Sequence, residues 1–173
     1  HSAPQFQMNR HALRMTQRLG FRWSSDAKGD QPFLPVWDGE IVRCPQYPVN
    51  LPTMDELIGY HQVTESNVHE KILSLTEHDS GNHFVMQFSA ELEGLTLRDS
   101  AEKLLAGLKA QGHEIVSLGK ILDQTNIFKL PYHEVSLQPN QTNSKAQSSH
   151  QQFTQGDEFL SAWRGVKVGT TTP

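Results

Sequence analysis

Asn82-His-Phe-Val-Met-Gln-Phe-Ser-Ala-Glu-Leu-Glu-Gly94 is the stretch of sequence from which the fold is predicted. Phe84 to Phe88 is rich in residues that favour β-structure, and Val85 to Glu93 largely alternates between apolar and polar side chains. This alternation is typical of a strand with one buried face. We therefore expect a strand here that ends in a corner from Ser89 to Gly94.

A helix and a second strand are expected directly after this corner. Four apolar residues recur at i, i+3, i+4 and i+7 and so share one helical face: Ala101, Leu104, Leu105 and Leu108. Gly112 is of the residue type that commonly ends a helix, and Ile115 to Leu118 favours a short strand. Two strands joined by a helix are parallel, with a right-handed crossover. The predicted fold class is therefore α/β, with parallel strands, covering helices and ligands bound beyond the carboxyl ends of the strands.

The composition excludes several classes of function. A formal charge of -4 provides no basic surface for nucleic acid, and the sequence has no apolar run of the roughly 18 residues that a membrane-spanning helix needs. The single cysteine, Cys44, excludes an internal disulfide and fits a reducing compartment. Because the chain begins with His1 and no signal-peptide pattern follows, we expect it to be cut from a longer protein.

A further strand with a polar exit is expected near the amino terminus. Phe21 to Trp23 has the character of a short strand, and Ser24 to Gly29 leaves it as a polar turn. Asp26 therefore lies where a site residue of an α/β sheet is expected. An Asx-turn that caps Lys28 and the residue after it explains Asp26 equally well.

Helix caps and apolar spacing predict three further helices, over residues 10–19, 54–58 and 67–77. Asn9 can cap the first of them, with an apolar stripe expected along its length, and Thr53 with Glu56 forms a capping box before the second. Prolines recur between Gln31 and Pro52. Because proline excludes regular helix and is confined to sheet edges, this segment is expected to run extended at an edge or as a covering loop.

The composition shifts after Ile121-Leu122. Leu137 to Gly156 is dominated by Gln, Asn, Ser, Thr and Lys. Such a segment cannot bury enough apolar surface to offset its ordering entropy. We therefore divide the chain into a folded part, residues 1–127, and a polar tail, residues 128–173, which is expected to be disordered.

Several motifs, in order, resemble one enzyme family. These are Phe21-Arg-Trp-Ser-Ser-Asp-Ala-Lys-Gly29, Gln31-Pro-Phe-Leu-Pro35 and Pro45-Gln-Tyr-Pro-Val-Asn-Leu-Pro-Thr-Met-Asp-Glu-Leu-Ile-Gly59. They resemble the later segments of the bacterial 4-deoxy-4-formamido-L-arabinose-phosphoundecaprenol deformylases. Val85 to Gly94 resembles the strand that ends, in those enzymes, in a His followed by Ala-Glu-x-Glu-Gly. The resemblance covers residues 2 to 122.

The resemblance implies a fold and an activity. The family belongs to the polysaccharide deacetylase superfamily, whose fold is an irregular β/α barrel. It implies a hydrolase that removes the formyl group from an amino sugar on undecaprenyl phosphate, a step in lipid A modification and antimicrobial peptide resistance. In the family one Asp and two His hold a divalent metal, a second Asp acts as base toward the metal-bound water, and a late His acts as general acid.

The same resemblance makes the chain the C-terminal part of such an enzyme. The metal and base motifs of the family lie upstream of the segment that corresponds to Ser2 to Phe6, so the metal ligands are not expected in this chain. The implied partners are the lipid-linked amino sugar and the missing N-terminal half of the same protein. The implied location is the cytoplasm, with peripheral contact at the inner face of the bacterial inner membrane.

Five residues receive site roles from the resemblance. Asp26 matches an Asp that orients catalytic groups, and Ser89 stands where the family has its late His. Phe6 lies in the position of an aromatic residue of the substrate loop. Glu91 and Glu93 would share one face of the expected strand with Ser89 and meet the sugar. An ordinary core contact for Phe6, and solvent exposure for the two glutamates, are the competing interpretations.

Ser89 is the departure that leaves two functions open. A serine hydroxyl has far too high a pKa to act as an acid near neutrality. Either another group supplies the proton, or the protein is a catalytically silent relative that binds a lipid-linked sugar or a protein partner. The histidines show no spacing typical of a zinc site, and Cys44 has no nearby His in the sequence to activate it.

Overall fold

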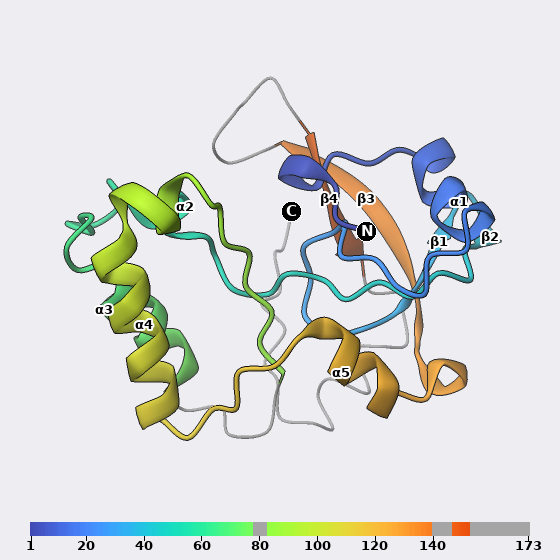
Figure 1. Cartoon of the computed structure of the whole chain (residues 1–173). Coiled ribbons are helices and arrows are strands. Elements are labelled where there is room, and N and C mark those ends of the chain that lie inside the picture. Colours follow the sequence, from blue (N-terminus) through green and yellow to red (C-terminus); the bar gives the residue numbers. More distant parts are fainter. Residues whose placement is uncertain (78–82, 140–146, 153–173) are drawn as a thin grey trace, which may run out of the picture.

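The computed structural model describes residues 1–77, 83–139 and 147–152, and it shows a mixed α/β fold (Figure 1). Within these residues, a four-stranded sheet has the order β2-β1-β3-β4. Its strands are β1 (Leu34–Trp37), β2 (Glu40–Ile41), β3 (Tyr132–Pro139) and β4 (Gln147–Gln152). The predicted α/β class is confirmed.

The sheet combines one parallel and two antiparallel pairs. β1 and β2 form a hairpin whose two turn residues, Asp38 and Gly39, have φ of 50° and 76°. An Asp-Gly pair with both φ positive is the turn that matches the twist of two adjoining strands. β1 runs parallel to β3, with Leu34 opposite Tyr132, and β3 runs antiparallel to β4.

Strands β3 and β4 lie where the composition predicts disorder. In β4, Ser148, Ser149 and Gln151 are buried, and the side chains of Ser148 and Gln151 have partners in the amino-terminal segments. Ser148 Oγ donates to the carbonyl of Gln5 at 3.0 Å, and Gln151 Oε1 accepts from the amide of Asp30 at 2.8 Å. Hydrogen bonds thus order a segment that has little apolar surface, and the prediction of disorder is wrong for residues 132–139 and 147–152. Residues 140–146 and 153–173 lie outside the described residues.

The helices were predicted better than the strands. They are α1 (Arg10–Arg18), α2 (Met54–Leu57), α3 (Val68–Thr76), α4 (Arg98–Ala110) and α5 (Leu118–Gln124), with short helical turns η1 (Pro4–Phe6), η2 (Leu92–Thr96) and η3 (Ile127–Lys129). The first four correspond to predicted helices. Asn9 caps α1 by accepting from the amide of Ala12 at 2.9 Å, and Glu56 accepts from the amide of Thr53 at 3.1 Å. Of the apolar stripe expected on α1 from Ala12, Met15 and Leu19, Ala12 packs against the core, whereas Leu19 is 65% exposed, and Leu13 is the apolar residue of this helix that is buried.

The predicted β-α-β unit around α4 does not form. Residues 83–89 run extended without belonging to a strand. The carbonyl of Val85 accepts from the amides of Asn50 and Leu51, but the amide of Val85 donates to the side chain of Asn50 at 2.7 Å. Phe84 and Met86 pack against the buried cluster of α3 and α4, so their alternation reflects packing on helices. After α4, residues 115–117 are not a strand, and Leu118 begins α5.

Two clusters of buried residues hold the segments that carry the candidate site residues. In Figure 1, α3 and α4 lie side by side at a distance from the sheet, and Val68, Ile72 and Leu104 are completely buried between them. The other cluster surrounds Phe33, which is also completely buried and lies next to β1. The segment from residue 24 to 28 lies beside this second cluster. The strand predicted just before it, over residues 21–23, does not form.

Candidate functional site

The segment that contains Asp26 is held on both sides by other segments. The isolated parallel pairs are Ser24 with Gln46, Lys28 with Val49, and Lys28 with His150 of β4. Asp26 thus lies between the proline-rich segment and the polar carboxyl-terminal strand. Segments that are distant in the sequence therefore fix its backbone.

The Asx-turn interpretation of Asp26 is wrong. An Asx-turn would need the amides that follow Asp26 to donate to its side chain. The amide of Lys28 donates instead to the carbonyl of Ser149 at 2.9 Å, and the amide of Gly29 donates to the carbonyl of Val49 at 3.2 Å. The carboxylate of Asp26 is therefore available for other partners.

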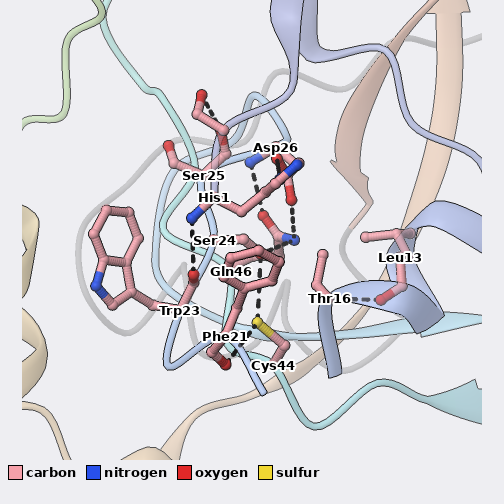
Figure 2. Close-up of polar contacts among 11 residues, drawn as sticks. His1, Leu13, Thr16, Phe21, Trp23, Ser24, Ser25, Asp26, Cys44 and Gln46 are labelled. Carbon is pink, nitrogen blue, oxygen red and sulfur yellow. Dashed lines mark hydrogen bonds and ion pairs between the residues drawn. The ribbon is translucent and has the colours of Figure 1, made fainter. Parts of the chain in front are cut away.

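The carboxylate of Asp26 is completely buried and accepts from two side chains (Figure 2). Its Oδ1 lies 2.7 Å from Nδ1 of His1, and its Oδ2 accepts from Nε2 of Gln46 at 3.3 Å. Oε1 of Gln46 accepts in turn from the amide of Asp26 at 2.9 Å. Since a buried carboxylate is costly without hydrogen-bond donors, these contacts offset the cost of burying Asp26.

Gln46 extends the network to the interior. Its Nε2 donates to Oγ of Ser24 at 2.7 Å, and that hydroxyl lies 3.6 Å from Sγ of Cys44. The thiol of Cys44 donates to the carbonyl of Phe21 at 3.5 Å and is buried. The inner end of the network is therefore closed to solvent, which leaves Cys44 without the access that a nucleophile needs.

His1 forms the open end of the network. Its side chain is 37% exposed, whereas that of Asp26 is 0% exposed. The imidazole packs against the ring of Phe21, with centroids 5.3 Å apart. Sequence reasoning missed His1 and Gln46, because each meets Asp26 across 20 residues or more and no local spacing signals the contact.

A second charged cluster surrounds Lys28. Its amino group forms an ion pair with Glu56, and both side chains are largely buried. The Nζ of Lys28 also lies 5.5 Å from the centroid of the Phe6 ring. Burial, reinforced by the positive charge of Lys28, lowers the pKa of His150, and the charge of Glu56 opposes this. Phe6 is 4% exposed, which fits a core contact, so its role toward substrate stays a prediction.

The Ser89 corner is closed by its own residues. The amide of Ser89 donates to Oε2 of Glu93 at 2.6 Å, and the amide of Glu93 donates to the carbonyl of Ser89 at 3.0 Å. Glu93 is buried and Glu91 is exposed. The shared face predicted for the three residues is wrong, because the chain turns into η2 here and forms no strand. Their roles toward substrate stay predictions.

A small hollow lies between neighbouring segments, and it is lined by Asp30, Gln31, Pro32, Tyr47, Pro48, Asn50, His83, Val85 and Ile121. Burial raises the pKa of Tyr47. Neither Asp26 nor Ser89 lines this hollow.

Comparison with known proteins relates the chain to one family, although no family model matches it. The chain is 35% identical over 115 residues to the probable 4-deoxy-4-formamido-L-arabinose-phosphoundecaprenol deformylase ArnD of Shewanella sediminis (strain HAW-EB3). The resemblance to this deformylase family is confirmed over part of the chain. The protein of the same name from Wigglesworthia glossinidia brevipalpis is 31% identical over 106 residues. The matches cover 66% and 60% of this chain, and the chain spans 36% of the length of each relative.

The described residues do not provide the metal site that the deformylase resemblance implies. Among residues 1–77, 83–139 and 147–152, no three His, Cys, Asp or Glu side chains come together as they would to hold a metal ion. His1 and Asp26 lie together, but they are only two such side chains, and the carboxylate of Asp26 is bonded to His1 and Gln46. Of the helices that the structure describes, none combines the length and apolar character that crossing a bilayer requires.

Proposed function

We propose that the chain is the C-terminal part of a metal-dependent hydrolase that removes the formyl group from a formamido-arabinose carried on undecaprenyl phosphate, in lipid A modification. The observation that carries this proposal is the 35% identity over 115 residues to a protein named as such a deformylase. The buried carboxylate of Asp26 supports it, because this carboxylate bonds to side chains of other segments and not to the amides of its own turn. The product amine would make lipid A more cationic and would underlie antimicrobial peptide resistance.

The proposal includes a larger architecture. Residues 1–127 are the C-terminal part of a polysaccharide deacetylase-like barrel, and the strand pair β3 and β4 belongs to the polar segment that follows. The metal ligands and the base belong to an N-terminal half of the same protein. An N-terminal half outside this chain agrees with the share of each relative's length that the chain spans, 36%. The complete protein would work at the inner face of the bacterial inner membrane.

Within this chain, the proposed roles follow the geometry. Asp26 positions catalytic groups, since its carboxylate is buried and joined to an exposed imidazole. Glu91 is exposed beside the Ser89 corner and can accept from sugar hydroxyls. Glu93 supports the corner through the amide of Ser89, and Phe6 contributes an aromatic surface beside Lys28.

The test is formate release by the full-length gene product from an undecaprenyl-phosphate-linked formamido-arabinose, with and without a chelator. We expect formate release that chelation abolishes and that Asp26→Ala lowers by a factor on the order of 10² or more. Asp123→Asn is a matched control, because Asp123 forms an exposed ion pair with Arg22 and should keep full activity. A folded, metal-supplied protein that releases no formate would overturn the proposal.

A catalytically silent relative is the second candidate, and Ser89 is the observation that favours it. The hydroxyl of Ser89 cannot donate a proton at neutral pH as an imidazole can. In that case the full-length protein would bind the lipid-linked sugar, measured by calorimetry, without turnover. Ser89→His would then raise formate release from background, whereas an active unaltered protein would exclude this candidate.

A further inference from the structure

We propose that the imidazole of His1, held by Asp26, donates the proton to the amine that leaves during deformylation. His1 would then be a catalytic residue and Asp26 its positioning residue. The inference rests on the proposed function and deepens it, because it names a group that can do what the hydroxyl of Ser89 cannot. It is carried by the geometry of the network in Figure 2.

The burial of the pair is asymmetric. His1 is 37% exposed and Asp26 is completely buried. The other ion pairs of the described residues are symmetric. Six are exposed at both ends, namely Arg10–Asp38, Arg10–Glu40, Arg14–Glu40, Arg22–Asp123, Arg98–Glu102 and Lys120–Glu114, and Lys28–Glu56 is largely buried at both ends. A solvent-exposed pair contributes little to stability. A buried carboxylate behind an accessible imidazole is instead the arrangement that supports proton transfer.

The contacts also fix which nitrogen would act. Nδ1 of His1 bonds to Asp26, and a hydrogen bond at one imidazole nitrogen determines the state of the other. The ring is further held by Phe21, and the amide of Ser25 donates to the carbonyl of His1 at 2.8 Å. Nε2 is thus the nitrogen that can exchange protons with a substrate. A carboxylate on Nδ1 also stabilises the protonated imidazole that a donor must be.

The step conserves atoms and charge. Water adds to the formyl carbon, and as the resulting tetrahedral adduct collapses, the carbon–nitrogen bond breaks and its electron pair remains on nitrogen. The protonated Nε2 of His1 delivers its proton to that nitrogen. One proton of the attacking water passes to the base assigned to the N-terminal half, and the other is released when the formic acid product ionises to formate. The products are the free sugar amine and formate, and neutral His1 recovers a proton from solvent.

The ionisable groups that bear on His1 are few in the described part of the chain. Asp26 contacts the imidazole directly, and Gln46 and Ser24 connect Asp26 to the thiol of Cys44. Phe21, on the other side of the ring, carries no charge. A pH dependence assigned to His1 must therefore be checked in a variant of Asp26.

The experiment compares two substrates of the full-length gene product. For the lipid-linked formamido-sugar, His1→Gln should lower kcat by a factor on the order of 10² to 10⁴, with KM nearly unchanged. For 4-nitrophenyl formate, whose phenolate leaves without a proton, the loss should stay below about tenfold. Asp26→Asn should show the same contrast. His11→Gln, an exposed histidine on α1, is the matched control and should keep both rates.

The outcomes separate this inference from the proposed function. Equal losses on both substrates would assign His1 a structural role and overturn the inference, as would full activity of His1→Gln on the formamide. If His1→Gln unfolds, His1→Asn, which keeps a donor near the Nδ1 position, replaces it in the same comparison. A folded, unaltered protein that releases no formate would refute the proposed function itself, and the inference would fall with it.

Discussion

Replacing Gln46 with leucine tests how much the buried hydrogen-bond network around Asp26 contributes to the free energy of unfolding. Leucine has a similar volume, so the change removes hydrogen bonds without opening a large cavity. Two buried groups lose a partner: the amide of Asp26, at a cost of roughly 1–3 kcal/mol, and the carboxylate of Asp26, at roughly 1.5–3 kcal/mol. The hydroxyl of Ser24 also loses a donor. We expect the free energy of unfolding to fall by about 3–5 kcal/mol.

The measurement is urea unfolding followed by circular dichroism, with Gln17→Leu as the matched control. Oε1 of Gln17 accepts from the amide of Arg43 at 2.8 Å in an exposed position, so the same substitution there should cost less than about 1 kcal/mol because water replaces the lost partner. Equal midpoints for the two variants, at unchanged slope, would show that the buried amide contributes no more than an exposed one. The account of the Asp26 network would then be refuted.

Three further predictions concern packing and pH. Gly29→Ala places a Cβ 2.5 Å from the Cβ of Gln151 and should cost roughly 1–3 kcal/mol in a thermal melt, whereas Gly94→Ala, with open space around it, should be tolerated. Leu104→Ala empties a completely buried position between α3 and α4 and should lower the free energy of unfolding by roughly 2–5 kcal/mol. The same change at Leu105, which is 37% exposed, should cost much less, and equal losses would contradict the helix packing. Because burial lowers the pKa of His150 from its usual 6.5, the unfolded chain binds more protons, and stability should decrease as pH falls below 6.5. In His150→Gln, the loss of stability below pH 6.5 should be smaller than in the unaltered protein. A denaturation midpoint with the same pH dependence in both proteins would contradict this.

Local signals in the sequence predicted what is local in the fold. The cap at Asn9 and the apolar spacing of α4 depend on residues within a turn or two. The structure confirms the cap and the burial of Ala101 and Leu104 on α4, whereas Leu105 of the same predicted face is exposed. Gly112 follows α4 with φ of 90°, as expected of a residue that ends a helix. The strands around α4 were wrong because alternation at Phe84 and Met86 serves packing against helices as well as it serves a sheet.

Non-local contacts explain what the sequence did not reveal. β4 is ordered through bonds such as that between Gln151 and Asp30, which are 121 residues apart. Composition cannot report such pairings, because it counts apolar surface and not hydrogen-bond partners. The site shows the same division: Asp26 was found from its place in the chain, but its partners His1 and Gln46 come from other segments.

The position of β4 has a practical consequence for trimming the protein. The amide of Gln151 donates to the carbonyl of Lys28, and the amide of Lys28 donates to the carbonyl of Ser149, so β4 flanks the backbone that carries Asp26. Shortening the gene at codon 127, where the composition invites a cut, would strip away this neighbour together with β3. A product truncated there would lack the strand that flanks the candidate site around Asp26.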